Sequence, residues 1–256
     1  MSQCRLCGQD KKLVRAHVIP ESFFRVLRSG GENPRLISNA ANAFPQRAPI
    51  GVYDQGILCE ECERKFGHVD DYGARVLLTR FYELFHSVVH LDKTVALQAR
   101  DVDQELLLRF FIATLWRASV STHPFYSRVE LGKYEAQAKG VIDLSQPVRE
   151  TFAVVLSYWP TIKTTRNLPH ALMDPFREKW DGVNAYRFYF GQVVAYIKVD
   201  SRSFPRSLQD LALCRHNILS IVQRDFIGSK DFLAMAWTAK QSHQREQMAR
   251  ARRRKR

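Results

Sequence analysis

The sequence has no long hydrophobic run, and this absence excludes a membrane-spanning protein. Apolar runs are short, and two of them, 106–108 and 110–116, are separated by Arg109. Both are far shorter than the roughly 20 apolar residues that a transmembrane helix needs. The first residues also lack the charged segment followed by an apolar one that marks a secretory signal. We therefore expect a cytoplasmic protein that has no membrane partner.

Cysteine is scarce, with five in 256 residues, but four of the five are paired by spacing. Cys4 with Cys7 and Cys59 with Cys62 form two C-x2-C pairs, and 51 residues separate the pairs. In a reducing compartment, such pairs bind metal more often than they form disulfides. Four thiolates on one tetrahedral zinc leave no position for a catalytic water, so the pattern predicts a structural zinc ion. Two unrelated pairs of buried or redox cysteines are the alternative, and the lone Cys214 is expected in the core.

Acidic residues are fewer than basic ones, 26 against 39, which gives a formal net charge of +13. The last twelve residues carry much of this excess, because seven basic side chains face Glu246 alone. The predicted nucleic-acid contacts within this tail are Arg250, Arg252, Arg253, Arg254, Lys255 and Arg256. Such clusters displace counterions from phosphate backbones, which favours a polyanionic partner. A solvated tail that only keeps the protein in solution is the alternative.

The pattern of the first 95 residues predicts short strands and helices around the cysteine pairs. We expect a strand over 12–18, a helix over 21–28 ended by Gly30 and Gly31, and an irregular loop over 32–49. A strand over 52–58 should follow, and then a helix from Cys59 to about residue 90. A loop of that length inside a compact module is usually functional or mobile.

Beyond residue 95 the pattern predicts a larger mixed region. Asp101 or Asp103 can cap a long amphipathic helix, and a second helix is expected over 127–140. Strands are expected over 151–158, 185–190, 192–200 and 218–222, with a hairpin turn near Gly191. Ser229 should cap a final helix over 230–248. Phe110, Phe111, Trp116 and Phe125 are expected in the core rather than on a base-stacking surface.

Two segments of the first third of the chain carry the main functional signal. One is Arg15-Ala16-His17-Val18-Ile19-Pro20, and the other runs from Ile57 to Glu63 through the second cysteine pair. Together they resemble the zinc-stapled branch of the HNH (His-Me finger, ββα-metal) nucleases over about residues 3–75. The resemblance implies that His17 ends a strand and acts as general base on a water. It also implies that a loop asparagine, Asn39 or Asn42, orients the histidine.

The same resemblance implies a divalent cation, Mg²⁺ or Mn²⁺, held at the start of the following helix. The family usually has His or Asn just after the second cysteine pair, and here that position is Glu63, an acceptable ligand for a hard cation. His68 is a further candidate on the metal side, although it lies five residues further along, about 140° around a helix from Glu63, and cannot simply substitute for it. Asp70 and Asp71 are further oxygen donors nearby. Ala16 also departs from the acid or histidine that often precedes the first histidine.

We therefore expect an α+β protein with three parts. Residues 1–95 form a zinc-stapled ββα-metal-like module, 96–244 a larger α+β region with antiparallel strands and a C-terminal helix, and 245–256 the basic tail. The expected function is metal-assisted hydrolysis of DNA, and the middle region would recognise a partner protein or regulate access. The alternative is a zinc-stapled nucleic-acid-binding or interaction module without catalysis. The chain is also similar to poorly characterised bacterial proteins, some from anti-phage defence loci.

Overall fold

The structure is a computed structural model with a mixed α+β fold, as the sequence predicts. It describes residues 2–28, 35–37, 46–48, 50–148, 150–160 and 171–225, and then positions 227, 229–233, 236–237, 240 and 247–248. The basic residues Arg250, Arg252, Arg253, Arg254, Lys255 and Arg256 and the loop residues Asn39 and Asn42 lie outside the described residues. No described helix has the length and apolar character needed to cross a bilayer.

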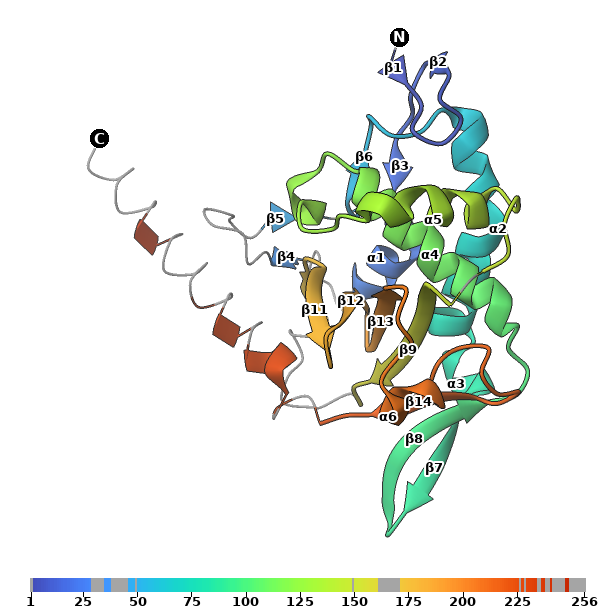
Figure 1. Cartoon of the computed structure of the whole chain (residues 1–256). Helices are drawn as coiled ribbons and strands as arrows, with labels where there is room; N and C mark the ends of the chain where they lie inside the picture. Colours follow the sequence, from blue (N-terminus) through green and yellow to red (C-terminus); the bar gives the residue numbers. More distant parts are fainter. Residues whose placement is uncertain are drawn as a thin grey trace.

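A seven-stranded sheet lies at the centre of the molecule (Figure 1). Its strands are β7 (His86–His90), β8 (Lys93–Ala99), β9 (Phe152–Tyr158), β11 (Phe176–Trp180), β12 (Val183–Phe190), β13 (Val193–Val199) and β14 (Leu219–Gln223). They are ordered β11-β12-β13-β9-β14-β8-β7, and every neighbouring pair is antiparallel except β9 with β14. The β7–β8 hairpin extends away from the rest of the fold (Figure 1).

The central strands are covered on both faces, which explains their nearly continuous apolar sequence. Every residue of β13 is buried, and it pairs with β12 on one side and β9 on the other. Phe190 pairs with Val193 across the hairpin turn at Gly191, so the hairpin predicted there is confirmed. The ring of Phe190 then meets Phe110 and Phe111 of the long helix at 5.5 and 5.4 Å between centroids.

The long helix that Phe190 contacts is α4 (Gln104–Val120). Asp103 caps it, because its carboxylate accepts a hydrogen bond of 2.9 Å from the backbone N–H of Leu106. Phe110, Phe111, Trp116 and Phe125 are buried in the core, as expected. Gly73 allows helix α2 (Glu60–Ala74) to approach α4 closely, since a Cβ atom there would lie 2.5 Å from the Phe110 ring.

Short paired strands build the N-terminal part. β1 (Ser2–Gln3) pairs with β2 (Asp10–Lys11), and β3 (Ala16–His17) pairs antiparallel with β6 (Tyr53–Asp54). Helix α1 (Glu21–Arg28) has the predicted bounds. β4 (Arg35–Ile37) pairs with β5 (Gln46–Arg47) and, in parallel, with β10 (Ala171–Met173). The segment expected as an irregular loop over 32–49 therefore contains two strands.

Several predicted boundaries are wrong. The strand expected over 12–18 is reduced to an isolated bridge at Leu13 and the two residues of β3, and the strand expected over 52–58 is reduced to β6. The helix expected to continue to residue 90 ends at Ala74, where a π-helical turn (Arg75–Thr79) and α3 (Phe81–Leu84) follow. Residues 86–90 form β7 instead, because their β-branched valines pair with β8.

In the second half of the chain, the element boundaries also differ from the predicted ones. A 3-10 turn, Pro124–Tyr126, precedes the helix expected over 127–140, and a second one, Gly132–Tyr134, lies within it, so that α5 spans only Glu135–Ile142. Cys214 is exposed rather than in the core, because it lies in a turn after the unpredicted helix α6 (Arg206–Gln209).

The final helix expected over 230–248 begins where the sequence predicts. Ser229 Oγ accepts a 3.0 Å hydrogen bond from the N–H of Phe232, so Ser229 is the cap. The described residues at 230–233, 236–237, 240 and 247–248 are helical. The expected apolar face is only partly covered, since Leu233 and Trp237 are exposed.

Candidate metal centre and the adjoining histidine site

The two cysteine pairs converge on one point. The sulfur atoms of Cys4, Cys7, Cys59 and Cys62 all lie within 4.8 Å of one another, and all four cysteines are free thiols. A tetrahedral zinc with metal–sulfur bonds of about 2.3 Å places its sulfurs roughly 3.8 Å apart. The cluster can therefore hold a metal such as zinc. Among the described residues it is the only group of three or more His, Cys, Asp or Glu side chains that converges in this way.

Backbone hydrogen bonds hold the two pairs in place. In the first pair, the N–H of Gly8 donates to Cys4 O at 2.8 Å and the N–H of Cys4 to Gln9 O at 2.9 Å. The second pair opens α2, where Cys59 occupies the position before the first helical residue. The N–H of Cys59 also donates to Cys4 Sγ at 3.4 Å, which links the two pairs directly.

The pKa values of two of these thiols, Cys4 and Cys62, are shifted in opposite directions. Burial opposes ionisation of Cys4, yet the backbone N–H groups of Cys7 and Cys59 outweigh it and lower its pKa to about 7. Burial raises the pKa of Cys62, and the neighbouring thiols raise it further. Four adjacent thiolates repel one another in the absence of a cation. A bound divalent metal would remove that repulsion, and this fits a four-sulfur metal site.

His17 lies at the end of β3, between the two cysteine pairs in the sequence, and is held through its ring. Its Nε2 atom is 3.0 Å from the backbone oxygen of Ile50. A carbonyl oxygen can only accept, so Nε2 carries the proton and the lone pair of the neutral ring is on Nδ1. Burial lowers the pKa of His17, although the Ile50 carbonyl and Glu21 oppose this shift. The half-buried ring is therefore biased toward the neutral form, which can accept a proton.

Gly51 sets the position of the Ile50 carbonyl. Its φ of +87° belongs to the left-handed region, which favours glycine. A Cβ atom at this position would lie 2.5 Å from the ring of Phe24, a fully buried residue of α1. The turn that orients His17 thus depends on a residue without a side chain.

Helix α2 carries two carboxylates, those of Glu63 and Asp70, in the region of His17. The backbone N–H of His17 donates to the carboxylate of Glu63, whose buried Oε2 atom has no hydrogen-bond partner among the described residues. Asp70, seven residues further along, binds Arg117 of α4 through two hydrogen bonds of 2.7 and 2.6 Å. Burial raises the pKa of Glu63, and the positive charge of Arg117 opposes that rise.

Arg117 belongs to this site although no sequence pattern indicates it. Its side chain is completely buried, and its guanidinium carbon lies 4.6 Å from the centre of the Phe66 ring. In the sequence, Arg117 is an arginine within an apolar helical segment. This pattern does not identify the residue with which the arginine pairs. Its charge acts on both Glu63 and His17. The site is thus built from the N-terminal ββα unit and from α4 together.

A second link connects the same two parts. The Asp54 carboxylate at the end of β6 accepts hydrogen bonds from Gly56 N at 2.7 Å, Ser121 Oγ at 2.8 Å and Thr122 N at 2.7 Å. Ser121 and Thr122 directly follow α4. The strand that pairs with His17 is therefore anchored to the C-terminal end of the long helix.

Of the remaining predicted residues, those that the structure describes do not join this group. His68 and Asp71 are exposed, whereas Glu63 and Asp70 are partly buried. Asn39 and Asn42 lie outside the described residues. In the part of the chain that the structure describes, no carboxylate set converges as a Mg²⁺ or Mn²⁺ site would require. The described residues therefore do not by themselves form a complete divalent-cation site near His17.

Comparison with known proteins adds no family. No family model matches the chain, and neither the curated proteins nor the solved structures contain a match to it.

Proposed function

We propose that this protein is a zinc-stapled endonuclease of the HNH type that hydrolyses phosphodiester bonds in DNA. The observation that carries the proposal is the environment of His17. A backbone carbonyl 3.0 Å from Nε2 fixes the proton on that atom. The opposite ring nitrogen is left to accept a proton from water. The ββα arrangement of β3, β6 and α2 beside four converging cysteines supports the same assignment.

In this proposal His17 Nδ1 removes a proton from the attacking water. Burial favours the neutral ring, so the base is available at neutral pH. A divalent cation such as Mg²⁺ or Mn²⁺, when bound, would supply electrostatic stabilisation at the phosphate. We assign no step to that ion, because the described residues do not complete a site for it.

A cleavage assay on supercoiled plasmid tests the role of His17. With Mg²⁺ or Mn²⁺ present, wild-type protein should nick the plasmid, and His17→Ala should reduce the rate at least a hundredfold. His68→Ala is a matched control, since His68 is an exposed histidine on α2, and it should retain the wild-type rate. Absence of cleavage by zinc-loaded wild type that still binds DNA would refute the nuclease assignment.

The proposed zinc ion is structural and holds the start of α2 against the first cysteine pair. Native mass spectrometry should find one zinc per chain, and Cys59→Ser should lose the metal and the cooperative melting transition. Cys214→Ser is the control, because Cys214 is a free cysteine that does not belong to the cluster. Retention of zinc and of the melting transition by Cys59→Ser would contradict the four-cysteine site.

The basic tail is proposed as a nonspecific phosphate anchor. Deletion of 245–256 should weaken DNA binding and flatten the dependence of the affinity on salt concentration. A fluorescence anisotropy titration at several salt concentrations measures both quantities. An unchanged salt slope would show that the tail contributes only solubility. We further propose a role in phage defence in the cytoplasm, which only the resemblance noted in the sequence implies.

The second candidate is a zinc-stapled module that binds nucleic acid or a protein partner without cleaving. The observation that favours it is Glu63, at the position where the resemblance implies a metal ligand. One carboxylate oxygen accepts from the backbone of His17, the other is buried, and the Arg117 cation acts on the group. DNA binding that survives both His17→Ala and metal depletion of the assay buffer, without cleavage by wild type, would support this candidate.

A further inference from the structure

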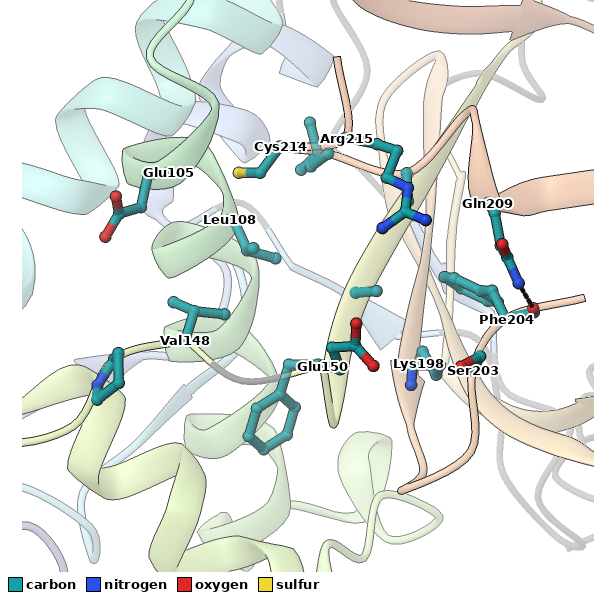
Figure 2. Close-up of a pocket in the computed structure, with 15 residues that line it drawn as sticks. Glu105, Leu108, Val148, Glu150, Lys198, Ser203, Phe204, Gln209, Cys214 and Arg215 are labelled. Carbon is teal, nitrogen blue, oxygen red and sulfur yellow. Dashed lines mark hydrogen bonds between the residues drawn. The ribbon is translucent and has the colours of Figure 1, made fainter. Parts of the chain in front are cut away.

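A pocket of 410 Å³ opens at the end of the central sheet. Its walls come from α4, the start of β9, the end of β13 and the segment 203–215 (Figure 2). Neither His17 nor Glu63 nor any of the four clustered cysteines lines it. Its volume falls within the range of small-molecule sites, which is about 300–1,000 Å³. The pocket is thus separate from the proposed nuclease site.

The floor of the pocket holds a buried positive charge. Lys198 on β13 is 1% exposed, and its Nζ atom donates to the backbone oxygens of Asp200 at 3.0 Å and Arg202 at 2.6 Å. An ammonium group has three N–H donors, and these two bonds are the ones that Lys198 makes to described residues. The carboxylate of Asp200 does not balance this charge alone, because Arg202 and Asn184 already bind it at 2.7 and 2.9 Å.

The other charged groups at the pocket leave a net charge of one positive unit. Glu105 is paired with Arg109 at 2.8 Å. Lys198, Arg215 and Glu150 remain, and their head groups face the same space in Figure 2. Burial lowers the pKa of Lys198, whereas the negative charges of Asp200 and Glu150 oppose that shift. The pocket therefore combines one buried cation, one exposed cation and one carboxylate.

Most of the remaining lining is apolar, although Ser203 and Gln209 also line the pocket, and one lining residue has a strained backbone. Leu108, Val148, Phe152, Phe204 and Leu213 contribute side chains without charge. Next to Leu213, Cys214 adopts a φ of +65°, and Gln104 Oε1 accepts its backbone N–H at 2.9 Å. A non-glycine residue held in the left-handed region is strained, and such strain concentrates at functional sites.

We propose that this pocket binds a small organic monocarboxylate with an apolar or aromatic body. The guanidinium of Arg215 would take the carboxylate in a bidentate pair, above the positive charge of Lys198. The apolar walls would cover the body of the ligand. One net positive charge matches a monoanion, whereas Glu150 would repel the second charge of a phosphate monoester. This site is independent of the proposed nuclease activity.

Binding of 3-phenylpropionate to the full-length protein, followed by isothermal titration calorimetry, tests the proposal. The carboxylate should bind saturably at one site, and the neutral 3-phenylpropionamide should bind at least tenfold more weakly. Arg215→Gln should weaken the carboxylate at least fivefold without changing the amide. Arg206→Gln is the matched control, because Arg206 is exposed on the neighbouring α6 and does not line the pocket.

Three outcomes would overturn the proposal. Equal affinity for the carboxylate and the amide would mean that no anion subsite exists. Unchanged binding by Arg215→Gln would exclude the assigned contact. Tighter binding of phenethyl phosphate than of 3-phenylpropionate would assign the pocket to a dianion instead. Arg215 is exposed, so its substitution is not expected to unfold the protein. Ala212→Trp provides a second variant, since it fills the pocket and should abolish binding of both probes.

Discussion

At the scale of single residues, Arg117 and Asp70 form the contact that most constrains the histidine site. The arginine side chain is 0% exposed and the aspartate side chain 16% exposed, so water does little to replace either partner. A buried charge that loses its partner is far more costly than a surface charge that does so. The pair therefore fixes the distance between α2 and α4 behind Glu63.

We expect Asp70→Asn to destabilise the protein by about 3–5 kcal/mol, because the buried guanidinium loses its counter-charge. Chemical denaturation followed by circular dichroism measures this change in the free energy of unfolding. The double variant Asp70→Leu with Arg117→Met should recover a large part of the loss, since it removes both charges. Glu83→Gln is the control, because its pair with Arg80 is exposed to solvent and should contribute little to stability. Equal losses in the two single variants would contradict this account.

Gly51 offers a second test at the same scale. Alanine there would meet the Phe24 ring in a backbone conformation that favours glycine, so Gly51→Ala should cost about 1–3 kcal/mol. The chemical shifts of His17 should also change, since the Ile50 carbonyl would move. Gly67→Ala on α2 has nothing within 4 Å of its new methyl group and should stabilise by about 0.5–1 kcal/mol. A neutral Gly51→Ala would show that the turn tolerates a side chain.

At the scale of secondary-structure elements, Asp54 joins β6 to the end of α4. Burial alone would raise its pKa, but the N–H of Gly56 and the donors of Ser121 and Thr122 outweigh burial and lower the pKa. A carboxylate whose pKa is lower in the folded state stabilises the fold above its unfolded pKa, about 3.9. That contribution is lost as the pH falls through the lower, folded pKa.

As the pH is lowered below about 4, the free energy of unfolding should therefore decrease. Asp54→Asn should make this decrease smaller. The variant should also be less stable at pH 7, because the amide cannot accept all of these hydrogen bonds as well as a carboxylate does. Denaturation at a series of pH values from about 2.5 to 7 measures both effects. Asp71→Asn removes an exposed carboxylate from α2 and should retain the wild-type slope. An unchanged slope in Asp54→Asn would contradict the assignment.

The elements that the sequence predicted well are those with a local signal. Asp103 caps α4, Ser229 caps the last helix, and Gly191 turns the β12–β13 hairpin. The end of α2 was missed because the chain continues through a π-helical turn without any helix-breaking residue. The pairing of β4 with β10 was not predictable either, since it joins Arg35 to Ala171 and no local pattern encodes it.

The candidate site likewise contains features that a local sequence signal predicted and contacts that no local signal predicted. The spacing of the four cysteines predicted a shared metal, and their sulfurs do converge. His17 was singled out by its position at the end of an expected strand, between the pairs, and by the resemblance to the HNH nucleases. The groups that act on His17 were not predicted. The hydrogen bond to the Ile50 carbonyl and the effect of the Arg117 charge depend on tertiary structure alone.

At the scale of the whole molecule, the N-terminal part depends on α4 and on the residues just after it. Asp70, Asp54 and Phe66 all find their partners there, and the Phe66 ring stacks on Trp116 with centroids 6.2 Å apart. A fragment of residues 1–95 would expose all of these groups to water. We therefore expect that it does not fold cooperatively even with excess zinc.

The fragment can be compared with a chain of residues 1–244, which retains α4 and the sheet. Thermal melting with and without zinc, together with the dispersion of amide resonances, distinguishes the two. The longer chain should keep the melting temperature of the full protein, and the short one should show no sigmoidal transition. A zinc-dependent, cooperative transition in 1–95 would show instead that this part is an autonomous domain.

The order of strands in the sheet has a consequence for synthesis. The centre of the sheet needs β9, β13 and β14, and β14 ends at Gln223. A growing chain therefore completes α4, with its buried aromatic face, well before the strands that cover that face exist. Contacts between distant segments slow folding, and exposed apolar surface invites aggregation in the meantime. The nascent protein therefore cannot complete this sheet, and cover that face of α4, until the segment through Gln223 has left the ribosome.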